Sequence, residues 1–306
     1  MSIAPHYIPE SEFPKTIAPG IHMTGNYFFN LFVIQGSEKT VLFETGVSGV
    51  VDAVIEQLQG LELSPDVLVP SHPHSDHITG LPGLREAFPH ADLVAAAGAR
   101  EFVAHPKAGA LLIKEDQFIS QKLEKQGITP GRPSLDTVPD MTGCRDIIEA
   151  ESWDLGGLTL ELIPVGGHSP GNLMAWVPEH RVLFCSDSLG FHYPGRQIWP
   201  LFFTGAAPYL KSLETIRDLA PEILCPAHQG PISGNQVQSL IQQALDQTRA
   251  MIQRLADADP GDTQLVDALF KESYRDEFTL YTPENIQNCN RLLIRRAGEF
   301  KASGEV

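Results

Sequence analysis

The sequence predicts an α+β fold that ends in an all-helical segment, and three observations support this prediction. Short apolar runs of strand length alternate with amphipathic segments of helical period over most of the chain. A strand–helix–strand pattern at 41–72 is repeated at 182–228. From residue 235 onward the pattern is wholly helical. We therefore expect a mixed domain over 1–233 and a helical segment over 234–306 that packs on or covers the active site.

The first half of the mixed domain is predicted from apolar periodicity and from the turn residues between the apolar runs. It contains strands over 31–35, 40–43, 67–69 and 93–96, and helices over 50–58, 79–88 and 108–126. The first two strands are expected to form a hairpin, and Thr79 is a candidate N-cap. Glycine and proline are frequent in 127–146, so that 100–150 is expected to be an inserted excursion of helix and loop.

The second half continues with strands and then turns helical. We expect strands over 158–165, 173–177 and 181–185, a helix over 208–220, and C-terminal helices over 235–257, 262–273 and 284–300. The internal repeat places His72 and His228 at equivalent strand ends, with Asp187 at the end of a neighbouring strand. Strand ends that meet at one edge of a sheet commonly form a site.

Composition excludes several classes of protein. The chain has 306 residues and a formal net charge of −16, which leaves little basic surface for binding nucleic acid. No apolar run approaches the ~18 residues that span a bilayer, so we expect no membrane segment. The N-terminus lacks the pattern of a signal peptide, and four separated cysteines without a C-x-x-C pair favour reduced thiols. These features predict a cytoplasmic protein.

The strongest chemical signal is the run H-x-H-x-D-H over residues 72–77. Pro73 disfavours a helical conformation at His72, so neighbouring side chains can converge on one point. Imidazole and carboxylate groups are ligands of zinc, iron and manganese. The run follows a predicted buried strand and precedes a predicted helix, as an active-site loop would. It therefore predicts a metal centre that contains His72, His74, Asp76 and His77.

Three further positions can supply the remaining ligands. His168 lies in a glycine-rich turn between two predicted strands, and His228 follows another strand. Asp187 ends an apolar strand, where a carboxylate needs a cation or hydrogen-bond donors. Together with the cluster at 72–77, these residues predict a site for two metal ions.

This arrangement over residues 20–232 resembles the metallo-β-lactamase superfamily, whose pattern is H-x-H-x-D-H, G-H-S/T-P-G, an aspartate and a last histidine. The resemblance implies a four-layer αββα sandwich with the metals at one edge of the sheets. It also implies that His72, His74 and His168 hold one metal. Asp76, His77 and His228 would hold the other, and Asp187 would bridge the two.

The resemblance further implies hydrolysis by a hydroxide that bridges two divalent ions, whose identity (Zn, Fe or Mn) the ligand set leaves open. Asp76 would also shuttle a proton to the leaving group. Class B1 β-lactamases have cysteine in the place of Asp187, which argues against antibiotic hydrolysis. Most relatives have aspartate where this chain has Glu44, so the role of Glu44 is open.

Within the superfamily, the chain is most similar to the quinolone-signal response proteins, which are thioesterase-like. The similarity consists of the stretch 183–190, the Trp-Pro-Leu sequence at 199–201 and the helical C-terminus. It implies an acyl ester substrate, first a thioester and next a lactone.

Aromatic residues are concentrated over 191–203, directly after Asp187, and predict an apolar wall of a substrate pocket. Tyr193 and His192 are candidate catalytic donors to a developing oxyanion. Farther along the chain, Phe278, Leu280 and Tyr281 precede the last helix and predict either a lid over the site or a face of a homodimer.

The leading hypothesis is a dinuclear metal hydrolase that acts on a small-molecule acyl ester. The alternatives are a mononuclear iron sulfur dioxygenase, a regulatory protein whose hydrolytic site is secondary, and a phosphodiesterase. The acidic net charge argues against the phosphodiesterase when its substrate is a nucleic acid.

Overall fold

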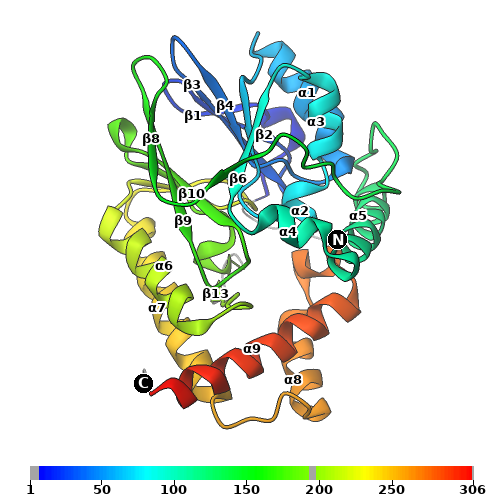
Figure 1. The fold of residues 1–306 in the computed structure, drawn as a ribbon, viewed down its shortest axis with the longest axis vertical. Helices are drawn as coiled ribbons and strands as arrows, with labels where there is room; N and C mark the ends of the chain where they lie inside the picture. The colour runs from blue at the N-terminus through cyan, green and yellow to red at the C-terminus, as the bar shows by residue number, and fades with distance from the viewer. Residues whose placement is uncertain (1–6, 193–197, 305–306) are drawn as a thin grey trace.

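Two β-sheets pack face to face, and helices cover their outer faces (Figure 1). The computed structural model describes residues 7–192 and 198–304. Tyr193 falls between these ranges, so the oxyanion role predicted for it concerns a residue outside the described ones. The arrangement confirms the predicted α+β sandwich with a helical C-terminal segment.

The first sheet has seven strands in chain order, antiparallel from the first to the fourth and parallel from the fourth to the seventh. They are β1 (Lys15–Ala18), β2 (Ile21–Gly25), β3 (Asn30–Gln35), β4 (Thr40–Phe43), β5 (Val67–Val69), β6 (Asp92–Ala96) and β7 (Arg145–Ile147). The hairpin predicted over 31–35 and 40–43 is confirmed as β3 and β4. The segment 100–150 ends in β7 at the edge of this sheet.

The second sheet has the order β15-β14-β11-β10-β9-β8, and β12 pairs separately with β13. The bounds are β8 (Glu151–Asp154), β9 (Thr159–Val165), β10 (Asn172–Val177), β11 (Val182–Phe184), β12 (Phe191–His192), β13 (Ile198–Trp199), β14 (Ile223–Cys225) and β15 (Ile232–Ser233). Strands β11 and β14 are parallel, as are β4 and β5. The internal repeat therefore corresponds to two equivalent parallel strand pairs.

The core follows from the alternation of side chains along each strand. In β3, Phe32 faces the other sheet, where its ring centroid lies 4.9 Å from that of Phe184, and Leu31 joins the cluster beneath the helices.

The described helices are α1 (Val51–Gly60), α2 (Ser75–Ile78), α3 (Leu81–Ala87), α4 (Ala99–Ala104), α5 (Pro106–Lys125), α6 (Ala206–Leu219), α7 (Gln236–Leu255), α8 (Thr263–Ser273) and α9 (Pro283–Ser303). The 3₁₀ helices are η1 (Glu10–Glu12), η2 (Ser48–Val50), η3 (Pro178–His180), η4 (Ser186–Leu189) and η5 (Asp276–Leu280).

The helix predicted over 79–88 is found as α3, but its predicted N-cap is wrong, because Gly80 is the N-cap of α3 and Thr79 is the C-cap of α2. Residues 75–78 already form α2, and α3 begins only at Leu81. A Cβ atom at Gly80 would lie 2.0 Å from the carbonyl oxygen of Thr45, so the backbone passes unusually close at this break. The Thr79 hydroxyl lies 2.6 Å from buried Asp116 of α5, and thereby fixes the end of α2.

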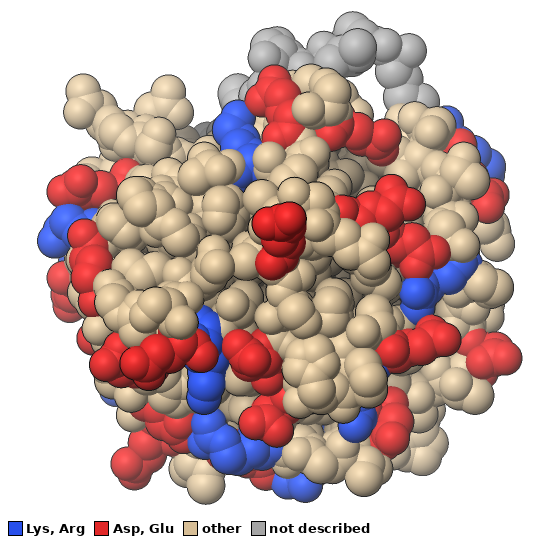
Figure 2. All heavy atoms as spheres, turned by 90° about the horizontal axis from the view of Figure 1, so that it is seen from above, with Lys and Arg blue, Asp and Glu red and all other residues tan. Residues whose placement is uncertain are grey.

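In the described part of the chain, no helix is both long enough and apolar enough to cross a membrane. On the face shown in Figure 2, acidic side chains are interspersed with smaller groups of basic ones. That face therefore presents no broad basic surface.

Candidate metal centre

Seven histidine and aspartate side chains converge beyond the ends of β5, β11 and β14. His72, His74, His168 and Asp187 form one group, and Asp76, His77, Asp187 and His228 form the other. Within each group the candidate ligand atoms lie within 4.8 Å of one another. The structure thus brings together all seven side chains expected to bind metal, and Asp187 belongs to both groups.

The first group is compact. His74 Nδ1 lies 3.0 Å from His72 Nε2 and 3.0 Å from His168 Nε2, and the two Nε2 atoms are 3.1 Å apart. Asp187 Oδ2 lies 3.4 Å from His168 Nε2. Ligands about 2.0–2.2 Å from a common cation lie roughly 3–3.6 Å apart in tetrahedral geometry. These separations therefore match a set of ligands around one cation.

The second group has similar spacing. His77 Nε2 lies 3.1 Å from Asp76 Oδ2 and 3.5 Å from Asp187 Oδ2. His228 Nε2 lies 3.4 Å from Asp76 Oδ2 and 3.5 Å from Asp187 Oδ1. Both Nε2 atoms are buried and lack a partner with hydrogen-bond geometry. Because buried polar nitrogens are normally satisfied, the pair fits a bound cation at this position.

The outer nitrogens of the histidines are held by protein groups. His77 Nδ1 lies 3.0 Å from Glu44 Oε2, His168 Nδ1 lies 3.0 Å from Leu201 O, and His228 Nδ1 lies 2.6 Å from Phe28 O. Acceptors at Nδ1 favour the tautomer that leaves Nε2 free to bind a metal. Glu44 therefore occupies the position of an orienting carboxylate, the role left open by the sequence.

Three residues next to the candidate ligands have positive φ angles. Glu44 and Ser186 have φ values of +75° and +46°, a region that residues other than glycine rarely adopt. Gly167 has a φ of +93°, and a Cβ atom there would lie 2.2 Å from the backbone nitrogen of Tyr209. The glycine before His168 is thus required by the close approach of α6.

The surroundings of these histidines lower the pKa of some and raise the pKa of others. Burial lowers the pKa of His74 to about 3, with a further contribution from His168. Burial also opposes the charged form of His228, but the nearby carboxylates of Asp187 and Asp76 outweigh it and raise the pKa to about 10. Although burial raises the pKa values of Asp76 and Asp187, His77 and His228 hold both well below the usual range. The centre therefore presents two ionised carboxylates to a cation.

A cavity of about 1100 Å³ opens onto this centre and contacts His74, Asp76, His168 and Asp187. Its other walls come from α4, α5, the segment after β13, and the C-terminal segment η5–α9. They are largely apolar and include Phe102, Leu111, Leu112, Phe191, Leu201, Phe203, Phe278, Ile286 and Leu292. The C-terminal helices thus line the space above the candidate metal centre.

Only part of the predicted aromatic wall lines this cavity. Phe191 and Phe203 do, whereas Phe202 is fully buried in the core. His192 pairs in β12 with Ile198 and is not among the residues that line the cavity. The oxyanion role expected for His192 therefore stays a prediction, and the position of His192 outside the cavity lining does not favour it.

Sequence reasoning missed the contact between Tyr281 and the centre. The Tyr281 hydroxyl donates a hydrogen bond of 2.7 Å to Asp76 Oδ2. The only sequence signal was a cluster of apolar residues before the last helix, which indicated a lid or a dimer face. A pairing between residues 205 positions apart is a property of the tertiary structure.

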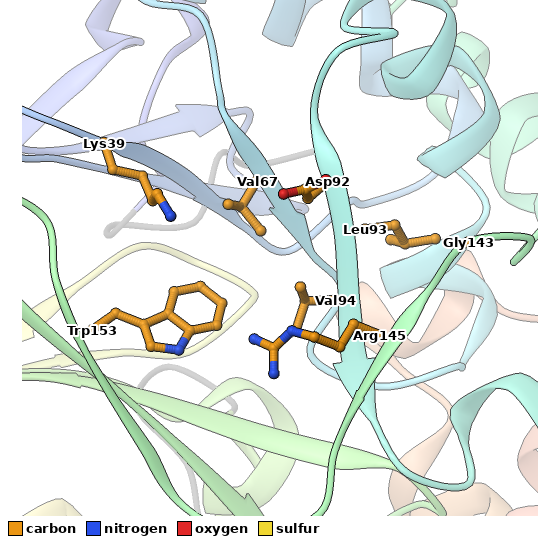
Figure 3. A pocket seen from close by; sticks show the side chains of 8 residues that line it. All are labelled: Lys39, Val67, Asp92, Leu93, Val94, Gly143, Arg145 and Trp153. Atoms are coloured by element: carbon orange, nitrogen blue, oxygen red, sulfur yellow. The ribbon is translucent and has the colours of Figure 1, made fainter.

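A smaller hollow of about 320 Å³ lies at the opposite ends of β5 and β6 (Figure 3). Lys39, Arg145 and Trp153 project toward it in the figure. Arg145 is already paired with Glu151 at 2.7 Å, and the Trp153 indole N–H donates to the same carboxylate at 2.8 Å. The larger cavity is therefore the better candidate for substrate binding.

Comparison with known families agrees with this geometry. Residues 26–228 match the family model of the metallo-β-lactamase superfamily. The chain belongs to the metallo-β-lactamase superfamily. Among solved structures, this superfamily member is similar to a metallo-β-lactamase family protein from Thermus thermophilus, with a TM-score of 0.64, 18% identity, and coverage of 94% of this chain and 95% of that one. A β-lactamase domain protein from Burkholderia ambifaria has a TM-score of 0.63, 20% identity, and coverage of 95% and 89%.

Curated relatives of this superfamily member include hydrolases. An acyl-coenzyme A thioesterase from Gallus gallus is 23% identical over 70% of this chain and 79% of its own length. A hydroxyacylglutathione hydrolase from Aeromonas salmonicida is 25% identical over 54% of this chain and 47% of its own length. An uncharacterized protein from Bacillus subtilis is 23% identical, over 65% and 82%. Together with the family match, these relatives indicate a hydrolase, and the finer similarity to quinolone-signal response proteins stays a prediction.

Proposed function

We propose that this protein is a metal-dependent hydrolase of small acyl thioesters that carry an apolar acyl group. The observation that carries the proposal is the opening of the paired histidine–aspartate groups into the largely apolar cavity of about 1100 Å³. A cavity of this character suits a hydrocarbon or aromatic acyl chain, with its carbonyl carbon at the polar end. The Gallus gallus relative, whose name states a thioester substrate, supports this substrate class.

In this proposal His72, His74 and His168 would hold one divalent cation, and Asp76, His77 and His228 would hold a second. Asp187 belongs to both groups and would contact both cations. When bound, such cations lower the pKa of a coordinated water and polarise a carbonyl oxygen. The native metal is zinc, iron or manganese, all of which accept this set of ligands.

The protein's own residues would then orient the substrate and transfer a proton from the attacking water to the leaving group. The apolar walls, including Phe203 and Leu112, exclude water from the acyl chain. Asp76 lines the cavity, and its Oδ2 accepts the hydrogen bond from Tyr281. Asp76 Oδ1 is therefore the oxygen that would take the proton from the attacking water and pass it to the leaving sulfur.

The test combines metal analysis with a substrate panel. Protein purified without chelator or nickel resin should contain about two metal ions per chain by mass spectrometry. It should hydrolyse apolar acyl thioesters faster than the matched lactones, oxygen esters and a phosphodiester reporter. One iron per chain with oxygen consumption in the presence of a thiol would contradict the proposal in favour of a dioxygenase. Turnover of the phosphodiester alone would also contradict it.

A further inference from the structure

The C-terminal segment reaches the candidate metal centre through the hydroxyl group of Tyr281. Tyr281 lies between η5 and α9, is 8% exposed, and donates to Asp76 Oδ2 at 2.7 Å. The residue also lines the substrate cavity. A side chain from outside the residues that match the superfamily model therefore contacts a candidate ligand directly.

The hydrogen bond is made to the oxygen of Asp76 that faces the second group of ligands. The same Oδ2 atom lies 3.1 Å from His77 Nε2 and 3.4 Å from His228 Nε2. The terminal torsion of an aspartate is broad, so its carboxylate can rotate unless a contact opposes the rotation. Donation from Tyr281 opposes this rotation and keeps Oδ2 directed toward the two histidines.

Polar contacts hold Tyr281 itself in place. The Thr282 backbone N–H donates to Glu115 Oε2 of α5 at 3.0 Å, and the Thr282 hydroxyl donates to the other oxygen of this buried carboxylate. The Tyr274 hydroxyl donates to the Tyr281 carbonyl oxygen at 3.1 Å. Packing alone would bury the tyrosine ring, but these contacts also fix the position of its hydroxyl.

We propose that Tyr281 is a positioning residue that holds Asp76 with Oδ2 directed toward His77 and His228. The C-terminal helical segment is thereby part of the catalytic machinery as well as a wall of the cavity. This inference rests on the proposed function for its effect on turnover. Its effect on metal binding is independent of any substrate.

The test is Tyr281→Phe, which removes the hydroxyl and keeps the ring. Cobalt(II) is titrated into metal-free protein, and its visible absorption reports each equivalent that binds. Losing a contact that orients a ligand typically weakens metal binding about 10–100-fold. We expect Tyr281→Phe to bind one cobalt equivalent with this weaker affinity and the other equivalent with unchanged affinity. We also expect kcat to fall about tenfold or more while KM changes less than about twofold, because the cavity wall is intact.

Tyr27→Phe is the matched control. Tyr27 is 2% exposed, and its hydroxyl donates to Glu277 of η5 at 3.0 Å, so this variant also removes a tyrosine–carboxylate hydrogen bond that anchors the C-terminal segment. We expect it to lose stability, as measured by urea unfolding, but to bind cobalt and turn over substrate as the wild type does.

Two results would overturn the inference. One is a Tyr281→Phe variant that binds both equivalents with wild-type affinity, and the other is a loss in Tyr281→Phe no larger than in Tyr27→Phe. If Tyr281→Phe does not fold, Glu115→Ala, which releases Thr282, should weaken the same equivalent of cobalt, and wild-type affinity in this variant would equally overturn the inference. A wild-type protein that hydrolyses no thioester would refute the proposed function, and the cobalt titration would still decide the role of Tyr281.

Discussion

His77 Nδ1 and Glu44 Oε2 are joined by a contact of 3.0 Å in which both side chains are buried. Glu44 follows β4 and His77 lies in α2, so the contact links the hairpin half of the first sheet to the histidine-rich loop. It leaves His77 Nε2 directed toward Asp76 and His228. The Glu44 side chain is thus long enough to reach the histidine from the end of β4.

Weakening this contact should weaken one metal site. Glu44→Gln keeps the shape of the side chain and removes its charge, so we expect about tenfold weaker binding of one metal equivalent. The measurement is a titration of metal-free protein followed by calorimetry. Glu38→Gln, on the exposed turn between β3 and β4, is the control. Unchanged affinity in Glu44→Gln would show that Glu44 does not orient His77.

Asp187 should matter to both metal sites. Its oxygens lie 3.4 Å from His168 Nε2 and 3.5 Å from His228 Nε2, one in each group of ligands. We expect Asp187→Ala to lower metal content at both sites and to lower kcat/KM by at least about a hundredfold. His228→Ala should remove only one equivalent. Metal content per chain by mass spectrometry distinguishes these outcomes, and two ions retained in Asp187→Ala would refute the shared-ligand assignment.

Removing metal should destabilise the fold. A ligand present at a hundred times its Kd stabilises the native state by about 2.7 kcal/mol, which corresponds to roughly 4 °C in Tm for a chain of this length. We expect a chelator to lower Tm by this amount in the wild type. The same chelator should change the Tm of Asp187→Ala much less. Equal Tm values for the wild type with and without chelator would argue against a resident metal.

The apolar cavity should set the preferred length of the acyl chain. Leu111 lines the cavity and is 37% exposed, so a larger side chain is accommodated there without disturbing the core. We expect Leu111→Trp to shift the kcat/KM optimum to shorter acyl thioesters, with losses of about tenfold for the longest ones. Ile148→Trp, at a residue that is 77% exposed and does not line the cavity, is the control. Identical chain-length profiles for Leu111→Trp and the wild type would place the acyl group elsewhere.

The buried carboxylate of Glu115 predicts a pH dependence of stability. Burial raises its pKa above the ordinary value of 4.5, despite hydrogen bonds from Thr282 that favour the charged form. Because the pKa is higher in the folded state, the contribution of Glu115 to stability is present below about pH 4.5 and is lost as the pH rises through the folded-state pKa. Glu115→Gln removes this titration. We expect the variant to gain stability relative to the wild type between pH 4 and pH 7 by urea unfolding, and a constant difference would refute the assignment.

Much of the fold could be predicted from the sequence because its signals are local. The strands β3, β4, β5 and β10 follow from apolar runs that are buried on both faces, and the three C-terminal helices follow from their amphipathic period. The edge strands β1 and β8 were missed because their residues are only partly buried and their apolar alternation is weak. The break at Gly80 was missed because the close approach of the Thr45 carbonyl group there depends on a distant segment and leaves no local signal.

The candidate ligands were determined by the sequence itself, since residues 72–77 and the strand ends at Asp187 and His228 carry recognisable chemistry in local patterns. Only the tertiary structure decided which side chains surround those ligands. Glu44, Glu115 and Tyr281 act at the site through contacts between distant segments. Such contacts produce no periodic pattern in the sequence. The physical reason is that a ligand residue is defined by its own chemistry, whereas an orienting residue is defined by where the packing of sheets and helices places it.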